Sequence, residues 1–178
     1  IGSASRLPLK SAASYWRPMS VSSTLNFAII GCGGITLQNH LPGLALCPAV
    51  KLAALCDTNP VPLENARQRT GVAIVSTRYQ EIVQRDDLHA VIIATPNFTH
   101  APIALAAVAH GKHVLCEKPL ALNAADAWAM AEAAERAGVR HMTAFTYRFV
   151  PAPVSYTHLR AHETVLDLVC RLLLYKKK

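Results

Sequence analysis

Three glycines and one carboxylate occur at a spacing that can hold phosphate and ribose. Gly31, Gly33 and Gly34 follow a short apolar run, and Asp57 ends the next apolar run along the chain. Gly31 permits a sharp turn, and Gly33, which has no Cβ, lets the backbone come close to a pyrophosphate. We expect a helix to begin near Ile35 and to direct its free N–H groups at the phosphates. A carboxylate about 20 residues further on can accept hydrogen bonds from both ribose hydroxyls. These five residues therefore predict a dinucleotide site.

The residues around Asp57 bear on which dinucleotide is bound. A carboxylate at this place repels a 2′-phosphate, and neither Thr58 nor Asn59 offers a cation to hold one. The sequence therefore favours NAD, with NADP less favoured. The third position of the glycine pattern is Thr36 instead of glycine or alanine, and we expect it to push helix and strand slightly apart. The alternative interpretation is an ordinary glycine turn between a strand and a helix.

Polar residues also follow other apolar runs. Thr95-Pro96-Asn97-Phe98-Thr99-His100, Glu117-Lys118-Pro119 and Tyr147-Arg148 each stand directly after such a run. In an open parallel sheet, ligands bind outside the carboxyl ends of the strands, so these segments are predicted to converge with the glycines. A lysine there could accept or organise the hydroxyl proton while hydride passes to a nicotinamide.

Each of these polar residues also has an ordinary structural interpretation. Lys118 could be a solvated surface lysine with Glu117 as its ion-pair partner. Asn97 and Thr99 could cap the following helix. His100 could be a helix-start residue or a ligand contact, and His40 fits a core or rim position better than a catalytic one.

The order of apolar runs and helical patterns predicts the architecture. Apolar strands that alternate with helices are typical of an α/β fold with a doubly wound parallel sheet, the Rossmann fold. We expect strands at 27–30, 50–56, 73–76, 90–94, 113–116 and 140–145, and helices after Ile35 and at 61–70, 79–83, 102–110 and 124–137.

Composition narrows the class of protein. The net charge is +7, but residues 1–18 and 154–178 contribute +3 each, so the middle of the chain carries only +1 and does not suggest nucleic-acid binding. No apolar run approaches the roughly 20 residues of a membrane span. The cysteines at 32, 47, 56 and 116 have no C-x-x-C spacing and indicate reduced residues of a cytoplasmic protein, without a metal.

The two ends look unlike the middle. Met19 is a natural start, so we expect residues 1–18 to be disordered upstream translation and 19–153 to form the dinucleotide-binding domain. The segment VSYTHLRAHET at 154–164 resembles a translated sequencing adapter, which would make 154–178 a non-native tail. The alternative is a basic amphipathic helix that binds a membrane or a partner.

Several motifs together resemble the Gfo/Idh/MocA oxidoreductases, a family that includes glucose–fructose oxidoreductase and inositol dehydrogenases. They are GCGGIT (31–36), the terminal Asp57, ATPNFTH (94–100), GKHVLCEKPLA (111–121) and YRFVPA (147–152). The resemblance implies an NAD(P)-binding domain followed by a substrate domain, and we expect that second domain to be missing from this chain.

The resemblance also implies roles for individual residues. Lys118 would be catalytic or orient the substrate, and Glu117 would help to fix the nicotinamide ribose. Thr95, Pro96, Asn97 and His100 would line that ribose, and Arg148 would lie near the hinge to the second domain.

The implied activity is hydride transfer between nicotinamide and a sugar, polyol or related hydroxyl compound. The full-length protein would be a homo-oligomer, and this fragment would be inactive alone. The alternative is a non-catalytic dinucleotide-binding or sensing module.

Overall fold

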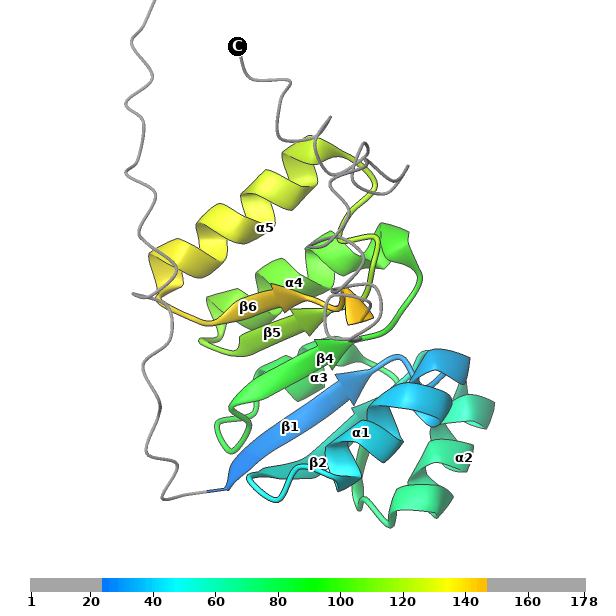
Figure 1. Cartoon of the computed structure of the whole chain (residues 1–178). Helices are drawn as coiled ribbons and strands as arrows, with labels where there is room; N and C mark the ends of the chain where they lie inside the picture. The colour runs from blue at the N-terminus through cyan, green and yellow to red at the C-terminus, as the bar shows by residue number, and fades with distance from the viewer. Residues whose placement is uncertain (1–23, 147–178) are drawn as a thin grey trace, which may run out of the picture.

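The computed structural model describes residues 24–146 and contains a parallel sheet (Figure 1). Arg148 and the two end segments, 1–18 and 154–178, lie outside the described residues. The strands are β1 (Leu25–Ile30), β2 (Val50–Cys56), β3 (Ile74–Ser76), β4 (Ala90–Ile93), β5 (His113–Cys116) and β6 (His141–Thr143). All neighbours pair parallel in the order β3-β2-β1-β4-β5-β6. The prediction of a doubly wound parallel sheet is confirmed.

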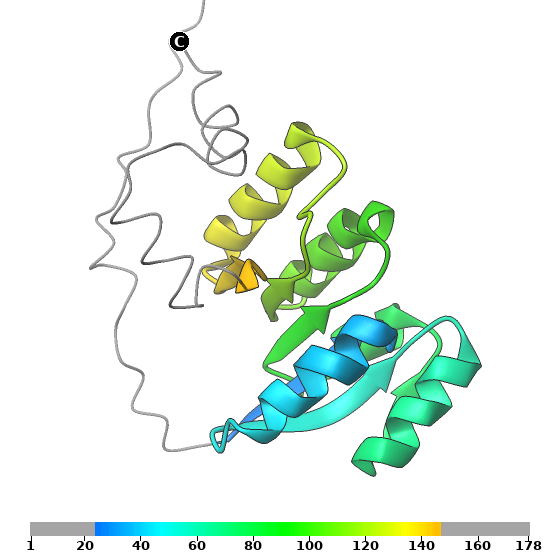
Figure 2. The same cartoon turned by 45° about the vertical axis from the view of Figure 1, so that its right-hand side comes forward.

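Helices cover both faces of this sheet (Figure 2). They are the π-helical turn η2 (Thr36–His40), α1 (Leu41–Ala45), α2 (Pro60–Thr70), α3 (Tyr79–Val83), the 3-10 turn η3 (Asn97–Thr99), α4 (His100–Ala109) and α5 (Ala124–Ala137). One buried cluster joins Ile29 and Leu55 of the sheet to Leu63 of α2. A second joins Ile30 and Ile93 to α3, α4 and α5. Neighbouring residues of one strand, such as Ile29 and Ile30, thus pack against helices on opposite faces of the sheet. Because both faces are covered, the strands are mostly apolar along their length.

Helix ends follow the local sequence closely. The side chain of Asn59 accepts a hydrogen bond from Val61 N–H at 3.0 Å, and that of Asn123 accepts one from Asp126 N–H at 2.9 Å. Gly71 and Gly138 end α2 and α5 in the left-handed conformation. These caps explain why both helices lie within one residue of their predicted bounds.

The helix predicted at 102–110 begins earlier. It starts at His100, after the 3-10 turn, and neither Asn97 nor Thr99 caps it through its side chain. The Thr99 hydroxyl lies 2.7 Å from that of Thr95 and 2.6 Å from the Pro96 carbonyl oxygen. Hydrogen bonds within the loop therefore occupy the hydroxyl that the sequence offered as a cap.

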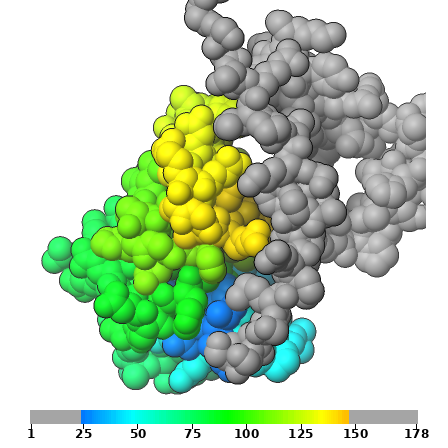
Figure 3. Space-filling model, turned by 90° about the vertical axis from the view of Figure 1, so that its left-hand side faces the viewer, coloured from blue at the N-terminus to red at the C-terminus, as the bar shows by residue number. Residues whose placement is uncertain are grey.

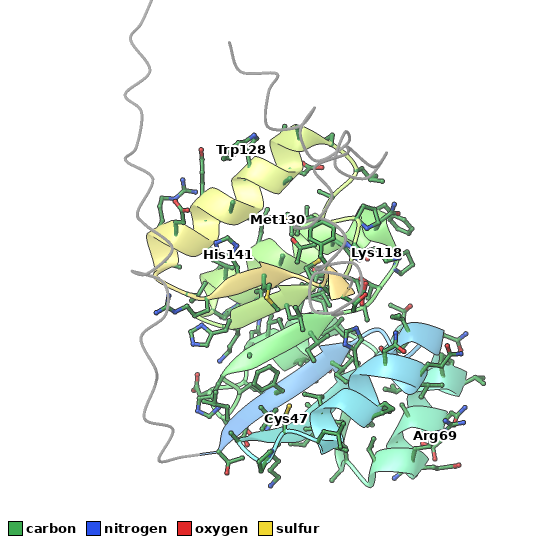
Figure 4. The ribbon with its side chains drawn as sticks, viewed as in Figure 1. Cys47, Arg69, Lys118, Trp128, Met130 and His141 are labelled. Atoms are coloured by element: carbon green, nitrogen blue, oxygen red, sulfur yellow. The ribbon has the colours of Figure 1, made fainter. Side chains whose placement is uncertain are left out.

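Three of the described thiols are buried, two at the ends of strands and one in the turn after β1. Burial raises the pKa of Cys32, Cys56 and Cys116 from 9.0 to about 12, and the Asp57 carboxylate adds to the effect at Cys32. Cys47 is exposed, beside the beginning of β2 (Figure 4). In residues 24–146, no group of three or more His, Cys, Asp or Glu side chains could hold a metal ion. Over the same residues, no helix has the length and apolar character that crossing a bilayer requires.

These thiols predict a loss of stability in alkali. In the unfolded chain a thiol ionises near pH 9, whereas in the folded chain it stays protonated until about pH 12. Each buried thiol therefore makes its full contribution to the free energy of unfolding below pH 9. That contribution is lost as the pH rises toward 12, at up to about 1.4 kcal/mol per pH unit for each thiol. Urea unfolding at a series of pH values should show this decline. Cys116→Ala should make it shallower, while Cys47→Ser should leave it unchanged.

Candidate functional site

The glycine turn after β1 is wedged between the ends of two other strands. Gly31 has φ +101°, and a Cβ at this position would meet the backbone of Ala94 and lie 2.8 Å from Thr95 N. Its N–H donates to Cys56 O at 2.7 Å, and Ala94 N–H donates to Ile30 O at 2.8 Å. The turn predicted for Gly31 is present, and it brings together the carboxyl ends of β1, β2 and β4. In open α/β sheets, ligands bind at the carboxyl ends of the strands where the strand order reverses, which here is between β1 and β4. We call this place the crevice.

The helix that follows begins beside open space. A Cβ on Gly33 would have no atom within 4 Å, and one on Gly34 would meet only the end of the Gln38 side chain at 4.0 Å. The first helical bond runs from Leu37 N–H to Gly33 O at 3.1 Å. Ile35 is 36% exposed on the first turn. A helix start with exposed glycines can bring its N–H groups close to phosphate oxygens.

Thr36 fills the position where the glycine pattern usually has a small residue. Its side chain is fully buried, and its hydroxyl donates to Gly31 O at 2.6 Å. The helix runs as a π turn over Thr36–His40, which is wider than an α-helical turn. The structure thus ties Thr36 to the glycine turn by a hydrogen bond that the sequence pattern did not suggest.

Asp57 joins the glycine turn to the start of α2. Its Oδ2 accepts a hydrogen bond from Cys32 N–H at 2.7 Å, and its Oδ1 accepts one from Asn59 N–H at 2.8 Å. The residue is half-buried at the end of β2. A carboxylate can accept about four hydrogen bonds, so both oxygens keep capacity for ribose hydroxyls.

His100 links the two loops on the other side of the crevice. It is 1% exposed, with Nε2 2.8 Å from Thr95 O and Nδ1 2.9 Å from Pro119 O. Its ring thus reaches backbone at the ends of both β4 and β5. The cofactor contact that the sequence predicts for His100 stays a prediction, and the same holds for Thr95, Pro96 and Asn97.

Glu117 and Lys118 stand at the end of β5, beside the glycine helix. Glu117 is 7% exposed and its N–H donates to Ile93 O at 2.9 Å. Its Oε2 accepts from Lys118 N–H at 3.1 Å, and its Oε1 lies 3.0 Å from His40 Nε2. The Lys118–Pro119 peptide is cis, the possibility that the sequence raised.

Lys118 itself is exposed, at the end of the sheet where the strands finish (Figure 4). Within residues 24–146 no ion pair joins it to Glu117, whose carboxylate is paired with His40 instead. Figure 3 shows the opposite end of the molecule, where α5 and β6 lie above the beginning of β1.

Sequence reasoning did not foresee the roles of Thr36 and His40. His40 comes from η2 yet contacts Glu117 after β5, 77 residues later in the chain. The only sequence signal was the helical spacing from Thr36 to His40 combined with a strand order that places β5 close to β1. Arg148, the remaining predicted contact, lies outside the described residues.

Comparison with known proteins shows the family of the chain. The profile of the Gfo/Idh/MocA group, described as "Oxidoreductase family, NAD-binding Rossmann fold", matches residues 25–145. Levoglucosan dehydrogenase of Pseudarthrobacter phenanthrenivorans is 36% identical in an alignment that covers 72% of this chain and 35% of that protein. D-xylose 1-dehydrogenase (NADP(+)) 2 of Haloferax volcanii is 34% identical over 77% of this chain and 42% of its own length.

The similar solved structures are also those of dehydrogenases and reductases. The 3-ketoreductase KijD10 of Actinomadura kijaniata, in complex with NADP and TDP-benzene, has a TM-score of 0.68 and 28% identity over 72% of this chain and 39% of its own. The dehydrogenase WlbA of Chromobacterium violaceum, with NADH and UDP-GlcNAcA, has a TM-score of 0.64 and 30% identity over 67% and 34% of the two chains. This chain spans about two-fifths or less of these relatives. The chain belongs to the Gfo/Idh/MocA oxidoreductase family.

Proposed function

We propose that residues 24–146 are the dinucleotide-binding part of an NAD(P)-dependent dehydrogenase that exchanges hydride with a sugar, polyol or related hydroxyl compound. The observation that carries the proposal is a set of contacts between strand ends. Gly31 joins the ends of β1, β2 and β4, and Glu117 bonds to both β4 and η2. The glycine turn, Asp57 and the Glu117-Lys118 segment therefore share one crevice, as a two-part cofactor requires.

The two halves of a dinucleotide would occupy different parts of the crevice. The open space beside Gly33, Gly34 and Ile35 suits the pyrophosphate, because N–H groups at the helix start can reach its oxygens. Asp57, at the end of β2, suits the adenosine ribose. The loops after β4 and β5 lie on the other side of β1, where the nicotinamide riboside would extend.

We assign the nicotinamide side to the remaining predicted residues. Thr95, Pro96, Asn97 and Glu117 would line the ribose, and His100 would act there through its bonds to the loops after β4 and β5. Arg148, outside the described residues, would contact the cofactor near the start of a following domain. A bound nicotinamide supplies the hydride acceptor or donor.

Lys118 is the proposed catalytic residue of this chain. Its backbone is held by Glu117 while its side chain is exposed at the crevice end of β5. An ammonium or amine group in that position can hold the substrate hydroxyl and take or return its proton as hydride moves. The chemistry of the substrate itself would be set by the part of the relatives that this chain does not span.

Asp57 supports NAD over NADP as the cofactor. Among the relatives, KijD10 is in complex with NADP and WlbA with NADH, so both occur in similar folds. In this chain the Asp57 carboxylate at the end of β2 would lie near a 2′-phosphate, and its negative charge would oppose binding of that phosphate. We further propose a cytoplasmic protein whose longer form is a homo-oligomer, on the resemblance and on its free thiols.

The test of this proposal is NADH binding by the 178-residue chain, measured by calorimetry. We expect dissociation constants in the micromolar range and a weakening of about tenfold or more in Gly33→Ala, because a Cβ would hold the pyrophosphate away from the helix start. Gly43→Ala is the matched control, since a Cβ there also has no atom within 4 Å but lies in α1. A folded chain that binds no NADH would overturn the proposal.

A further inference from the structure

The His40–Glu117 contact crosses the crevice. His40 ends η2, the turn that follows the glycines, and Glu117 follows β5, while β4 lies between β1 and β5 in the sheet. Nε2 of His40 is 3.0 Å from Oε1 of Glu117, and their side chains are only 11% and 9% exposed. This pair is therefore a direct link between the phosphate side and the Lys118 side of the proposed site.

Such a pair needs a reason to be buried. Removing a carboxylate and an imidazole from water is costly, and apolar residues of similar size often stabilise a fold at least as well. In the part of the chain that the structure describes, the other ion pairs, such as Arg67–Glu64, have side chains that are at least a third exposed. The His40–Glu117 pair, by contrast, is nearly buried and lies in the crevice, so its position points to the site more than to the core.

The contact also determines how Glu117 is turned. With Oε1 against His40, Oε2 faces the Lys118 N–H at 3.1 Å. A carboxylate with no partner for Oε1 could rotate and release that N–H. His40 thereby acts on Lys118 through Glu117, without any need to touch a ligand itself.

We propose that His40 is a positioning residue for the nicotinamide half of the cofactor, and that it acts by hydrogen bonding to Glu117. This inference rests on the proposed function, because it assigns Glu117 and Lys118 to the nicotinamide side. The adenosine half would contact Asp57 at the end of β2, on the other side of β1, where Asp57 is held by Cys32 and Asn59. Loss of the His40 bond should therefore be felt by one half of the dinucleotide only.

The experiment compares NADH with ADP, which has the adenosine and pyrophosphate but no nicotinamide riboside. Both dissociation constants are measured on the 178-residue chain and on His40→Leu, which keeps bulk without a donor. We expect NADH to bind about tenfold more weakly, the worth of a hydrogen bond to a charged group, and ADP to change less than about twofold. His40→Gln, whose amide can donate to the carboxylate, should restore most of the loss.

A control variant and three contrary results distinguish a wrong role for His40 from a wrong proposed function. His110→Ala, an exposed histidine at the end of α4, should alter neither constant. Equal weakening of NADH and ADP in His40→Leu, no weakening at all, or no recovery in His40→Gln would each overturn the inference. If the leucine variant does not fold by circular dichroism, His40→Ala answers the same question. An unaltered chain that binds neither NADH nor ADP would refute the proposed function instead.

Discussion

Gly31→Ala is expected to lower the free energy of unfolding by about 4 kcal/mol, from a strained positive φ and an overpacked contact together. The new methyl group would press on the backbone of Ala94 and Thr95, at the end of β4. Backbone in the middle of a sheet cannot move aside as a flexible side chain can. Because domains of this size are stable by only about 5–15 kcal/mol, urea unfolding followed by circular dichroism should show the change clearly.

Gly71→Ala is the matched control for this prediction. Gly71 also has a positive φ, +68°, at the end of α2, but a Cβ there would have no atom within 4 Å. Its substitution should cost only about 1 kcal/mol, the penalty of the left-handed conformation. Equal costs at the two positions would show that the close approach of the Gly31 turn to β4 does not limit stability.

Asp57→Ala is expected to weaken NADH binding by about 30-fold and to leave NADPH binding nearly unchanged. The variant loses the acceptor for ribose hydroxyls, worth about 2 kcal/mol for a charged hydrogen bond, and it also loses the repulsion of a 2′-phosphate. The Cys32 and Asn59 N–H groups would lose their partner as well. Calorimetry with both dinucleotides measures the ratio of affinities directly.

Two further variants define what the Asp57 result means. Asp57→Asn keeps the size and one oxygen but no charge, so it should lie between the original chain and Asp57→Ala. Asp86→Ala removes an exposed acidic side chain outside the crevice and should leave the ratio of affinities as it was. A chain that prefers NADPH before any substitution would contradict the choice of NAD.

Much of the fold could be predicted from the sequence because its signals are local. The apolar runs that became β2 and β5 have the predicted bounds, and Asn123 and Gly138 mark the ends of α5. The convergence of polar loops followed from a single rule about parallel sheets. The family could be predicted as well, because several motifs occur together, and the comparisons confirm it.

What could not be predicted depends on particular side-chain contacts that the residue pattern does not reveal. Thr36 looked like a departure from the glycine pattern, and only the packed helix shows its hydroxyl bonded to Gly31. Likewise, helical spacing and strand order were not enough to show that His40 meets Glu117, because the two residues are 77 positions apart in the chain. The early start of α4 has the same origin, since the Thr99 hydroxyl is used by its own loop.

The position of β1 in the sheet has a consequence for how the chain folds. β1 can pair with β2 as soon as residue 56 is available, but its other neighbour, β4, ends only at residue 93. During synthesis the edge of β1 that later pairs with β4 is unpaired. Unpaired edges of apolar strands tend to associate with other chains. Parallel pairing across so long a separation is also slow. The pairing of β1 with β4, next to Gly31 and Ala94, therefore also covers an apolar strand edge that would otherwise stay open to other chains.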